Sequence, residues 1–151
     1  MSKPNVHFSS ATDQWATPDD FFNKVSQAFK FDVDVCADKD NAKCAKFYTE
    51  EDNGLHQEWR GVCWMNPPYG RAIKLWIEKA YRSSQENGAT VVCLIPARTD
   101  TQYWHDYCTK GEVFFLKGRL KFGNATAGAP FPSAIVVFRP KLSDFLDGYT
   151  N

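Results

Sequence analysis

The chain has 151 residues, of which 43% are hydrophobic, and its twelve Phe and five Trp supply enough apolar material for one compact domain. Eighteen basic residues balance eighteen acidic ones, and this zero net charge argues against a polycation that coats DNA or membranes without specificity. No run approaches the ~18 apolar residues that a membrane helix needs, and the first residues lack the apolar stretch of a signal peptide. We therefore expect a cytoplasmic protein with no membrane partner.

The charges are unevenly distributed along the chain. Residues 1–52 carry ten acidic and six basic side chains, whereas residues 53–151 carry eight and twelve. The excess of bases in the second part suits a face turned towards nucleic acid, although an ordinary solvated surface has the same pattern. The five Cys and three His are not at metal-ligand spacings, so we expect reduced thiols and no metal site.

The first predicted element is a helix. Residues 17–20 are typical of a helix start, with a Thr cap, Pro at the first helical position and two acids in the first turn. The helix is expected to end near Lys30. Apolar residues recur along it at helical spacing and predict one buried stripe, made of Phe21, Val25, Ala28 and Phe29.

A strand is predicted next, over residues 31–38, because this segment is short and rich in Val and ends on the carboxylate of Asp38. The following twenty residues are polar and weakly periodic. We expect a short helix at 41–47 and an acidic loop at 49–54.

The middle of the chain has clearer patterns. Residues 61–65 predict a buried strand, and residues 71–86 predict an amphipathic helix closed by Asn87-Gly88. Residues 90–95 are almost continuously apolar, as in a parallel strand that is covered on both faces. The side chains of the helix that are expected to face inward are Ile73, Trp76, Ile77 and Ala80.

The last third of the chain predicts two strands, at 112–116 and 133–138, joined by a loop rich in Gly, Ala and Pro. A short helix before them carries Tyr103, Trp104 and Tyr107. Alternating strands and helices followed by two late strands predict the α/β class. We expect a mostly parallel sheet with an antiparallel pair at one edge and helices on both faces.

The most informative stretch is Asn66-Pro67-Pro68-Tyr69-Gly70, which follows the strand at 61–65. Each proline fixes its own φ near −65° and biases the residue before it towards extended geometry, so a stiff loop presents the side chains of Asn66 and Tyr69. A loop of this kind at the end of a strand suits a flat, polar ligand. A proline turn with Tyr69 covering the edge of the core would explain the same residues.

Polar groups also follow two other predicted strands: Asp34 and Asp38 on the first, and the Pro96-Ala97-Arg98-Thr99 segment on another. The carboxyl ends of the strands of an α/β sheet form its ligand crevice, so we expect these groups to meet there. Carboxylates in that place suit ribose hydroxyls or a cationic group. The chain has no G-x-G-x-x-G and no G-x-x-x-x-G-K-[ST], so neither a dinucleotide fingerprint nor a P-loop is indicated.

Six blocks of sequence, in this order, resemble the phage-type DNA N6-adenine methyltransferases, the Dam-like family. They lie at residues 14–18 (QWATP), 32–38 (DVDVCAD), 51–55 (EDNGL), 66–70 (NPPYG), 96–101 (PARTDT) and 118–122 (GRLKF). The resemblance implies a single Rossmann-like methyltransferase domain over residues 1–151, with its core at about 12–139 and short tails. It also implies S-adenosyl-L-methionine as the cofactor, DNA as the partner, and a bacteriophage or restriction-modification setting in the host cytoplasm.

The resemblance assigns the methyl-transfer site to Asn66, Pro67, Pro68 and Tyr69. Tyr69 would stack on an adenine flipped out of the DNA, and the Asn66 side-chain oxygen and the Pro67 carbonyl would accept hydrogen bonds from its exocyclic amine. Many relatives have Asp where this chain has Asn66. The uncharged amide implies that positioning of the amine contributes more than removal of its proton.

The resemblance also implies a set of cofactor contacts. They are Trp15, Thr17 and Pro18 at the methionine end, Asp34 and Asp38 near the amino group or ribose, and Asp52 and Leu55 beside the adenine. The residues alone leave other interpretations open. Trp15 would also serve as a hydrophobic staple on the first helix, and the two aspartates of the first strand would also serve as loop caps.

The expected DNA contacts are Arg71, Arg98, Arg119 and Lys121. Arg98 is equally explained as a loop residue, and 118–122 as a simple hairpin. The chain has no insertion large enough for a separate target-recognition domain. We therefore expect a relaxed or very short sequence preference, or help from a second subunit in a homodimer.

Two other functions are compatible with the same residues. One is methyl transfer to a protein glutamine or an RNA base, because an Asn-Pro-Pro-Tyr loop accepts several planar amides. The other is a noncatalytic nucleic-acid-binding module, which the basic second part and the aromatic residues suggest. The intact Tyr69 and both prolines favour a working enzyme over this module.

Overall fold

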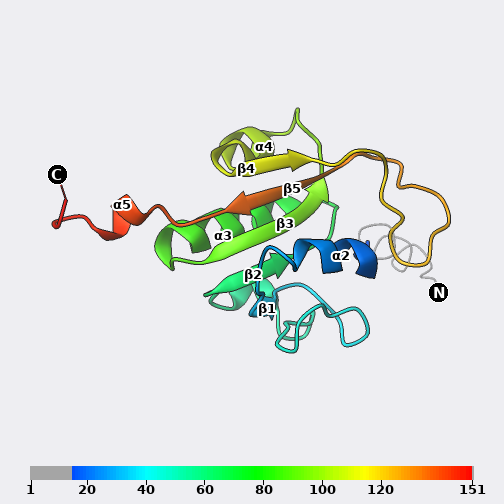
Figure 1. The fold of residues 1–151 in the computed structure, drawn as a ribbon, viewed down its shortest axis with the longest axis horizontal. Helices are drawn as coiled ribbons and strands as arrows, with labels where there is room; N and C mark the ends of the chain where they lie inside the picture. Colours follow the sequence, from blue (N-terminus) through cyan, green and yellow to red (C-terminus); the bar gives the residue numbers. More distant parts are fainter. Residues whose placement is uncertain (1–14, 151) are drawn as a thin grey trace.

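The computed structural model describes residues 15–150 and has a mixed α/β fold around one five-stranded sheet (Figure 1). The strand order is β1-β2-β3-β5-β4. The strands are β1 (Val33–Asp34), β2 (Val62–Met65), β3 (Thr90–Pro96), β4 (Glu112–Phe115) and β5 (Ser133–Phe138).

Four of the five strands run in one direction. β1, β2 and β3 pair in parallel, while β5 is antiparallel to both β3 and β4. The predicted α/β class, with mostly parallel strands and antiparallel members, is confirmed. The antiparallel pair β4–β5 lies at the edge, and the reversed strand β5 is inserted between β3 and β4.

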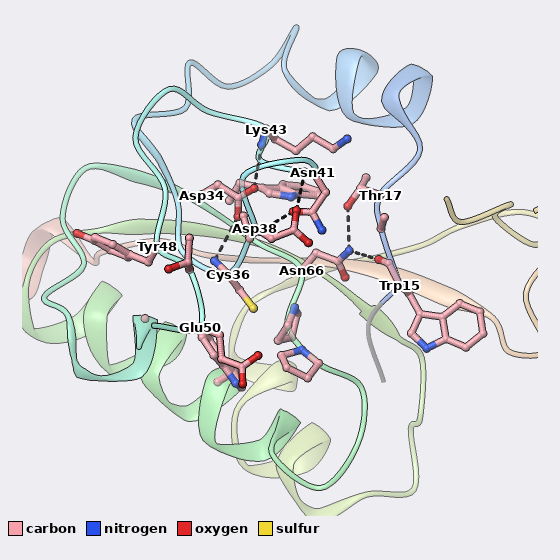
Figure 2. A pocket seen from close by; sticks show the side chains of 18 of the residues that line it. Trp15, Thr17, Asp34, Cys36, Asp38, Asn41, Lys43, Tyr48, Glu50 and Asn66 are labelled. Carbon is pink, nitrogen blue, oxygen red and sulfur yellow. Dashed lines mark hydrogen bonds between the residues drawn. The ribbon is translucent and has the colours of Figure 1, made fainter. Parts of the chain in front are cut away.

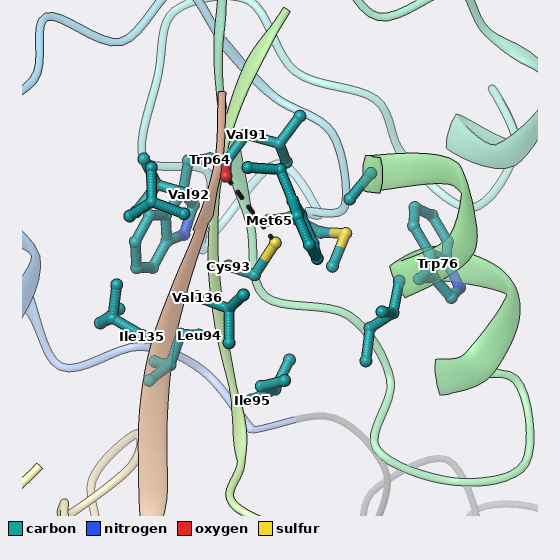
Figure 3. Close-up of a cluster of buried hydrophobic side chains, with 14 of the residues drawn as sticks. Trp64, Met65, Trp76, Val91, Val92, Cys93, Leu94, Ile95, Ile135 and Val136 are labelled. Atoms are coloured by element: carbon teal, nitrogen blue, oxygen red, sulfur yellow. Dashed lines mark hydrogen bonds between the residues drawn. The ribbon is translucent and has the colours of Figure 1, made fainter. Parts of the chain in front are cut away.

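Helices cover both faces of the sheet. α2 (Asp19–Val25) places Phe22 edge-on against Trp64 of β2, with ring centroids 5.1 Å apart. α3 (Ile73–Glu86) lies on the opposite face, where Trp76 is on the far side of the strands from Trp64 (Figure 3). The alternation of side chains along each strand therefore supplies two apolar layers from one sheet.

The centre of the core is the β3–β5 pair. Every residue of β5 is buried, and so is every residue of β3 after Thr90. Leu94 and Ile95 are fully buried neighbours that point to opposite faces of the sheet (Figure 3). Truncating either side chain to Ala would cost ~2–5 kcal/mol, because the well-packed surroundings collapse only partly into the space left.

The helix α3 forms as its sequence pattern predicted. It starts at Ile73, and the four residues predicted to face inward are all buried. Asn87 is its C-cap, and Gly88 follows with φ +72°, a left-handed conformation that glycine adopts without steric cost. The remaining elements are short: α4 (Gln102–Asp106), α5 (Leu142–Phe145) and the 3-10 turns η1 (Gly54–His56) and η2 (Cys108–Lys110).

The first helix is shorter than predicted. α2 ends at Val25, Phe22 rather than Phe21 is its buried residue, and Ala28 is exposed. The Ser26 hydroxyl donates to the Asn23 carbonyl, 3.0 Å away. Such local side-chain bonds compete with continued helical pairing, which accounts for the early end.

Thr17 does not cap this helix. Pro18 is the N-cap residue, with an extended backbone and no side-chain cap. The Thr17 hydroxyl instead accepts a hydrogen bond from the Asn66 side chain, 2.9 Å away. Thr17 therefore bonds to a residue distant in sequence and does not have the helix-capping role that the sequence pattern predicted.

The predicted strand at 31–38 is reduced to β1 because the Asp34 carboxylate turns the chain. Its Oδ1 accepts from the Cys36 N–H (3.2 Å) and its Oδ2 from the Lys43 N–H (3.0 Å). Both bonds draw the following segment back towards the end of β1. The strand prediction was therefore right in place and wrong in length.

The helix predicted at 41–47 is wrong. The Asp38 Oδ1 accepts from the N–H groups of Asp40 and Asn41, and the Asn41 Oδ1 accepts from the Asp38 N–H. These bonds hold the chain in a turn instead of a helix. Phe47 then forms an isolated parallel bridge with Asp34 beside the sheet.

Candidate active site

A cavity of about 610 Å³ opens at the carboxyl ends of β1 and β2 (Figure 2). The segment that enters α2 forms one wall, the 38–54 segment another, and the Asn66-Pro67-Pro68 loop a third. The predicted site residues that line it are Trp15, Thr17, Asp34, Asp38, Asn66, Pro67 and Pro68. Tertiary structure thus brings together groups that are more than fifty residues apart in the sequence, as expected for strand ends in an α/β sheet.

Asn66 is held by hydrogen bonds on both sides of its amide, and Figure 2 shows the two that its nitrogen donates. Its Nδ2 donates to the Trp15 carbonyl and to the Thr17 hydroxyl, and its Oδ1 accepts from the Tyr69 hydroxyl at 2.7 Å. A backbone carbonyl can only accept, so the amide nitrogen has to face Trp15. The orientation of the amide is therefore dictated by its partners.

This network explains why an amide suits position 66. An Asp there would place a carboxylate oxygen against the Trp15 carbonyl, so that two acceptors would meet with no proton between them. The Asn66 oxygen has two lone pairs, and the Tyr69 hydroxyl takes one of them. One acceptor position is left on an oxygen whose direction is set.

Tyr69 lies beside the cavity, under a cover of aromatic rings, and only 3% of it is exposed. Its ring is nearly parallel to that of Trp15, with centroids 6.4 Å apart, and the rings of Phe122 and Phe131 contact it edge-on. The Leu94 carbonyl, 3.2 Å from the same hydroxyl, is a second acceptor that shares its single proton. Burial raises the pKa of Tyr69 well above its ordinary value, so the hydroxyl stays neutral and keeps its proton for donation.

Asp34 is 2% exposed, and loss of solvent raises its pKa to about 6 despite the two backbone donors and the nearby Lys43. Asp34 and the more exposed Asp38 both hold turns of the 34–43 segment, so the loop-cap interpretation describes bonds that are present. Both also line the cavity. Structural and ligand-binding roles are compatible here, because a carboxylate has about four acceptor positions.

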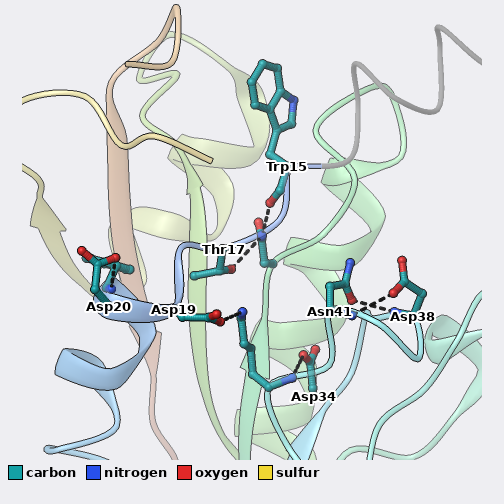
Figure 4. A network of polar contacts seen from close by, with 10 residues as sticks. Trp15, Thr17, Asp19, Asp20, Asp34, Asp38 and Asn41 are labelled. Carbon is teal, nitrogen blue, oxygen red and sulfur yellow. Dashed lines mark hydrogen bonds and ion pairs between the residues drawn. The ribbon is translucent and has the colours of Figure 1, made fainter. Parts of the chain in front are cut away.

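Lys43 is a cavity residue that no sequence pattern singled out. Its side chain is only 11% exposed, and its Nζ lies 2.5 Å from the Asp19 Oδ1 (Figure 4). The hydrogen bond and the positive charge lower the pKa of Asp19. The turn held by Asp34 brings Lys43 into this wall. Neighbouring residues in the sequence therefore do not indicate that Lys43 lines the cavity.

Glu50 and Asn53 were also missed. The segment before them runs beside β1, with the Asp34 N–H bonded to the Lys46 carbonyl and the Tyr48 N–H to the Asp34 carbonyl, both at 3.0 Å. It delivers Glu50 to the cavity two residues later. Asn53 has φ +54°, which is uncommon for a residue other than glycine and is a recurrent feature of ligand sites.

The three remaining predicted cofactor contacts do not line the cavity. Asp52 accepts from the Thr49 N–H at 2.9 Å and closes the 49–52 turn, while Leu55 packs on the core behind Gly54. Gly54 itself does line the cavity, and a Cβ atom there would lie 2.2 Å from the Val35 carbonyl oxygen. Pro18 stands at the helix entry, next to Thr17.

All four residues predicted to contact DNA are exposed. Two of them also hold loops: Arg98 Nη1 donates to the Tyr69 carbonyl at 3.1 Å, and Arg119 Nη1 donates to the Ala129 carbonyl at 3.2 Å. The Arg98 guanidinium also lies 5.9 Å from the centre of the Phe131 ring. Arg98 therefore ties the Tyr69 loop to the 118–132 loop.

Within residues 15–150, no group of three or more His, Cys, Asp and Glu side chains is placed to hold a metal ion. The same part of the chain contains no helix long and apolar enough to cross a membrane. The five cysteines are free thiols. Burial raises the pKa of Cys36 and of Cys63 to about 12, so neither is a thiolate at neutral pH.

Comparisons with known proteins give a consistent result. A family model described as DNA N-6-adenine-methyltransferase (Dam) matches residues 6–143. The chain is 36% identical over 152 residues to the DNA N-6-adenine-methyltransferase of Haemophilus phage HP1 (strain HP1c1), an alignment that covers 93% of this chain and 86% of the relative.

Two further relatives match. The DNA N-6-adenine-methyltransferase of Escherichia phage T1 is 32% identical over 153 residues, which cover 84% of this chain and 63% of that protein. The putative methyltransferase YfdM of Escherichia coli (strain K12) is 41% identical over 76 residues, which cover 45% of this chain and 84% of YfdM.

Proposed function

Because this chain belongs to the DNA N-6-adenine-methyltransferase (Dam) family, it is an adenine-specific DNA methyltransferase, and we propose that it uses S-adenosyl-L-methionine to methylate an adenine flipped out of DNA. One observation carries the proposal. Asn66 lines the cavity and is hydrogen-bonded to Tyr69 in the aromatic cluster. The methyl donor in the cavity and the adenine stacked on Tyr69 would therefore both lie beside the Asn66 amide.

The cavity suits the proposed cofactor in size and in chemistry. Its volume of about 610 Å³ is within the ~300–1,000 Å³ range of small-molecule sites. Its wall carries the carboxylates of Asp34 and Glu50 and the cation of Lys43. In the proposed arrangement, Glu50 accepts from the ribose hydroxyls, Lys43 pairs with the α-carboxylate and Asp34 receives the α-amino group.

The other predicted cofactor contacts fit the same arrangement. Trp15 and Thr17 form the wall at the methionine end, and Pro18 follows them as the N-cap residue of α2. Asp38 contacts the amino group or ribose from its turn, and Asp52 and Leu55 act indirectly, by shaping the Asn53-Gly54 wall beside the adenine. When bound, S-adenosyl-L-methionine supplies an electrophilic methyl group on a sulfonium sulfur.

The chain's own residues position the target amine. The second lone pair of the Asn66 Oδ1 and the Pro67 carbonyl accept its two N–H bonds, which directs the nitrogen lone pair towards the cavity. Tyr69 supplies the ring on which the base stacks, and Pro68 keeps the loop stiff. No strong base is part of this set, so rate enhancement comes mainly from positioning, and the proton leaves to water after the methyl group has transferred.

The proposed DNA face includes the long loop between β4 and β5. Residues 116–132 contain three cations and no acid. Phosphate contacts by Arg71, Arg98, Arg119 and Lys121 would make binding strongly dependent on salt. A very short sequence preference, a homodimer, a single domain over residues 1–151 and a role in restriction-modification stay predictions.

Purified protein incubated with radiolabelled S-adenosyl-L-methionine and adenine-containing DNA tests the proposal. We expect N6-methyladenine in the digested DNA, and no label in RNA or in protein glutamine. The matched control is Asn66→Ala, for which we expect a roughly hundredfold or greater loss of rate, comparable to removal of one hydrogen-bonding group from a preorganised site. Absence of methyladenine in every sequence context would contradict the proposal.

A further inference from the structure

The surface of Tyr69 on which the base is proposed to stack is already covered in this structure. Tyr69 belongs to a cluster of four aromatic rings whose six centroid distances all lie between 5.1 and 6.4 Å. The rings are Trp15, Tyr69, Phe122 and Phe131. Four nearly equidistant rings form a compact tetrahedral arrangement, which has no slot for a flat base.

The distance between Trp15 and Tyr69 shows this most directly. The two ring planes are inclined by 15° and their centroids are 6.4 Å apart. The distance between two nearly parallel planes cannot exceed the distance between their centroids, so the gap between the rings is at most 6.4 Å. A base inserted between two parallel rings requires about 7 Å, twice the ~3.4 Å stacking distance of nucleic acids. The gap is too small, and Tyr69 is only 3% exposed.

Trp15 is the ring best able to leave this cluster. It is half-buried, whereas the exposed fractions of Tyr69, Phe122 and Phe131 are 3%, 5% and 9%. Tyr69 is tethered through its hydroxyl to Asn66 and Leu94, and Phe131 lies under the guanidinium of Arg98. Displacement of the indole, the most exposed of the four rings, uncovers the face of Tyr69 that it covers.

The backbone of Trp15 is anchored independently of its side chain. Its carbonyl accepts from Asn66, and the next carbonyl, that of Ala16, accepts from the Gly123 N–H at 2.9 Å. The indole and the carbonyl of Trp15 point in opposite directions (Figure 4). Rotation about the side-chain bonds therefore moves the ring while the support of Asn66 stays in place.

We infer that the Trp15 indole occupies the target-adenine site of the free protein and exchanges with the base, so that Trp15 competes with adenine for the ring of Tyr69. This inference rests on the proposed role of Tyr69 as the stacking surface. It makes the apparent affinity for the base depend on the fraction of molecules in which the indole has swung out. Trp15 therefore acts as a substrate-mimicking gate.

The direct test is a titration with 2-aminopurine deoxyriboside, followed by its fluorescence, in the absence of a methyl donor. Trp15→Ala should bind this nucleoside roughly two- to tenfold more tightly than the parent protein, the factor that corresponds to the loss of one competing ring contact. Trp15→Phe, which keeps a smaller ring, should lie between them. Equal or weaker binding by Trp15→Ala would overturn the inference, and weaker binding would make Trp15 a second stacking wall instead.

The double variant Trp15→Ala/Tyr69→Ala separates this inference from the proposed function. We expect it to lose the gained affinity, because the vacated surface has gone. If the double variant retains the gain, Tyr69 is not the stacking surface, and both the inference and the proposed base site fail. If the parent methylates DNA while Trp15→Ala shows no gain, only the inference fails.

A measurement on the parent sequence covers the case in which Trp15→Ala does not fold. In protein labelled with 5-fluorotryptophan, the ¹⁹F signal of Trp15 is assigned by its loss in Trp15→Phe. A single-stranded oligonucleotide that contains adenine should shift this signal, whereas oligo-dT should leave it in place. The same response to both oligonucleotides, or to neither, would contradict exchange between the indole and adenine.

Discussion

Two walls meet at Asn66, and they are built by different forces. The polar wall, formed by Thr17, Asp34, Asp38 and Lys43, is held by directional hydrogen bonds between side chains and backbone. The aromatic wall, the four-ring cluster around Tyr69, is held mainly by packing. Directional bonds set one geometry before a ligand arrives, whereas ring contacts can be exchanged for those of a base. The polar wall is therefore suited to a cofactor, and the aromatic wall to a substrate that has to enter.

The largest expected effect concerns the buried carboxylate of the polar wall. The pKa of Asp34 is raised from 3.8 to about 6, so the folded protein binds a proton more tightly than the unfolded chain does. Its contribution to stability is fully present below pH ~4 and is lost as the pH rises through about 6, a change of about 3 kcal/mol for this shift.

Asp34→Asn should remove this contribution. The free energy of unfolding, measured with urea between pH 4 and pH 7, should fall less steeply with rising pH in the variant than in the parent. Asp40→Asn, in the same turn but exposed, is the matched control. Parallel curves for parent and Asp34→Asn would show that Asp34 is not the group responsible.

A change at the junction of the two walls comes next. Asn66→Asp should reduce the methylation rate at neutral pH by roughly ten- to hundredfold, because the hydrogen bond from the Asn66 amide to the Trp15 carbonyl is replaced by a contact between two acceptors, at a cost of ~1–3 kcal/mol. The protonated carboxyl can donate to that carbonyl. The rate of the variant relative to the parent should therefore rise as the pH falls, and a ratio independent of pH would argue against the assigned network.

Two substitutions of Tyr69 should separate the contribution of its ring, which belongs to the aromatic wall, from that of its hydroxyl, which supports Asn66. Tyr69→Ala removes the stacking surface and should weaken binding of adenine-containing DNA by ~1–3 kcal/mol. Tyr69→Phe keeps the ring but removes the donor to Asn66, so it should lower kcat several-fold with little change in affinity. Fluorescence anisotropy measures the DNA affinity of the two variants, and steady-state kinetics measure their kcat. Equal effects of both variants on DNA affinity would contradict separate roles for the ring and the hydroxyl.

The smallest expected effect is at Thr17. Thr17→Val keeps the shape of the side chain and removes the acceptor for the Asn66 Nδ2, which should cost ~0.5–1.5 kcal/mol and slow methylation roughly two- to tenfold. Thr17→Ser should restore most of the rate. If Thr17→Val and Thr17→Ser have the same methylation rate in single-turnover kinetics, the Thr17 hydroxyl does not position Asn66.

Much of the frame of this fold was predictable. The apolar stripe of α3 and the continuous apolar runs of β3 and β5 dominate their own segments, and these elements formed where expected. The segment at 31–47 was harder, because Asp34, Asp38 and Asn41 bond to backbone groups that a longer strand or helix would use. Competition between local side chains and regular pairing leaves no periodic signal.

The site divides in the same way. The sequence by itself determined that a stiff Asn-Pro-Pro-Tyr loop follows a buried strand, because proline geometry and strand periodicity are local properties. Only the tertiary structure decided that the Thr17 hydroxyl supports Asn66, that Lys43 and Glu50 reach the cavity, and that Trp15 covers Tyr69. These contacts join segments far apart in the chain, and their energies exist only once the sheet has brought the strand ends together.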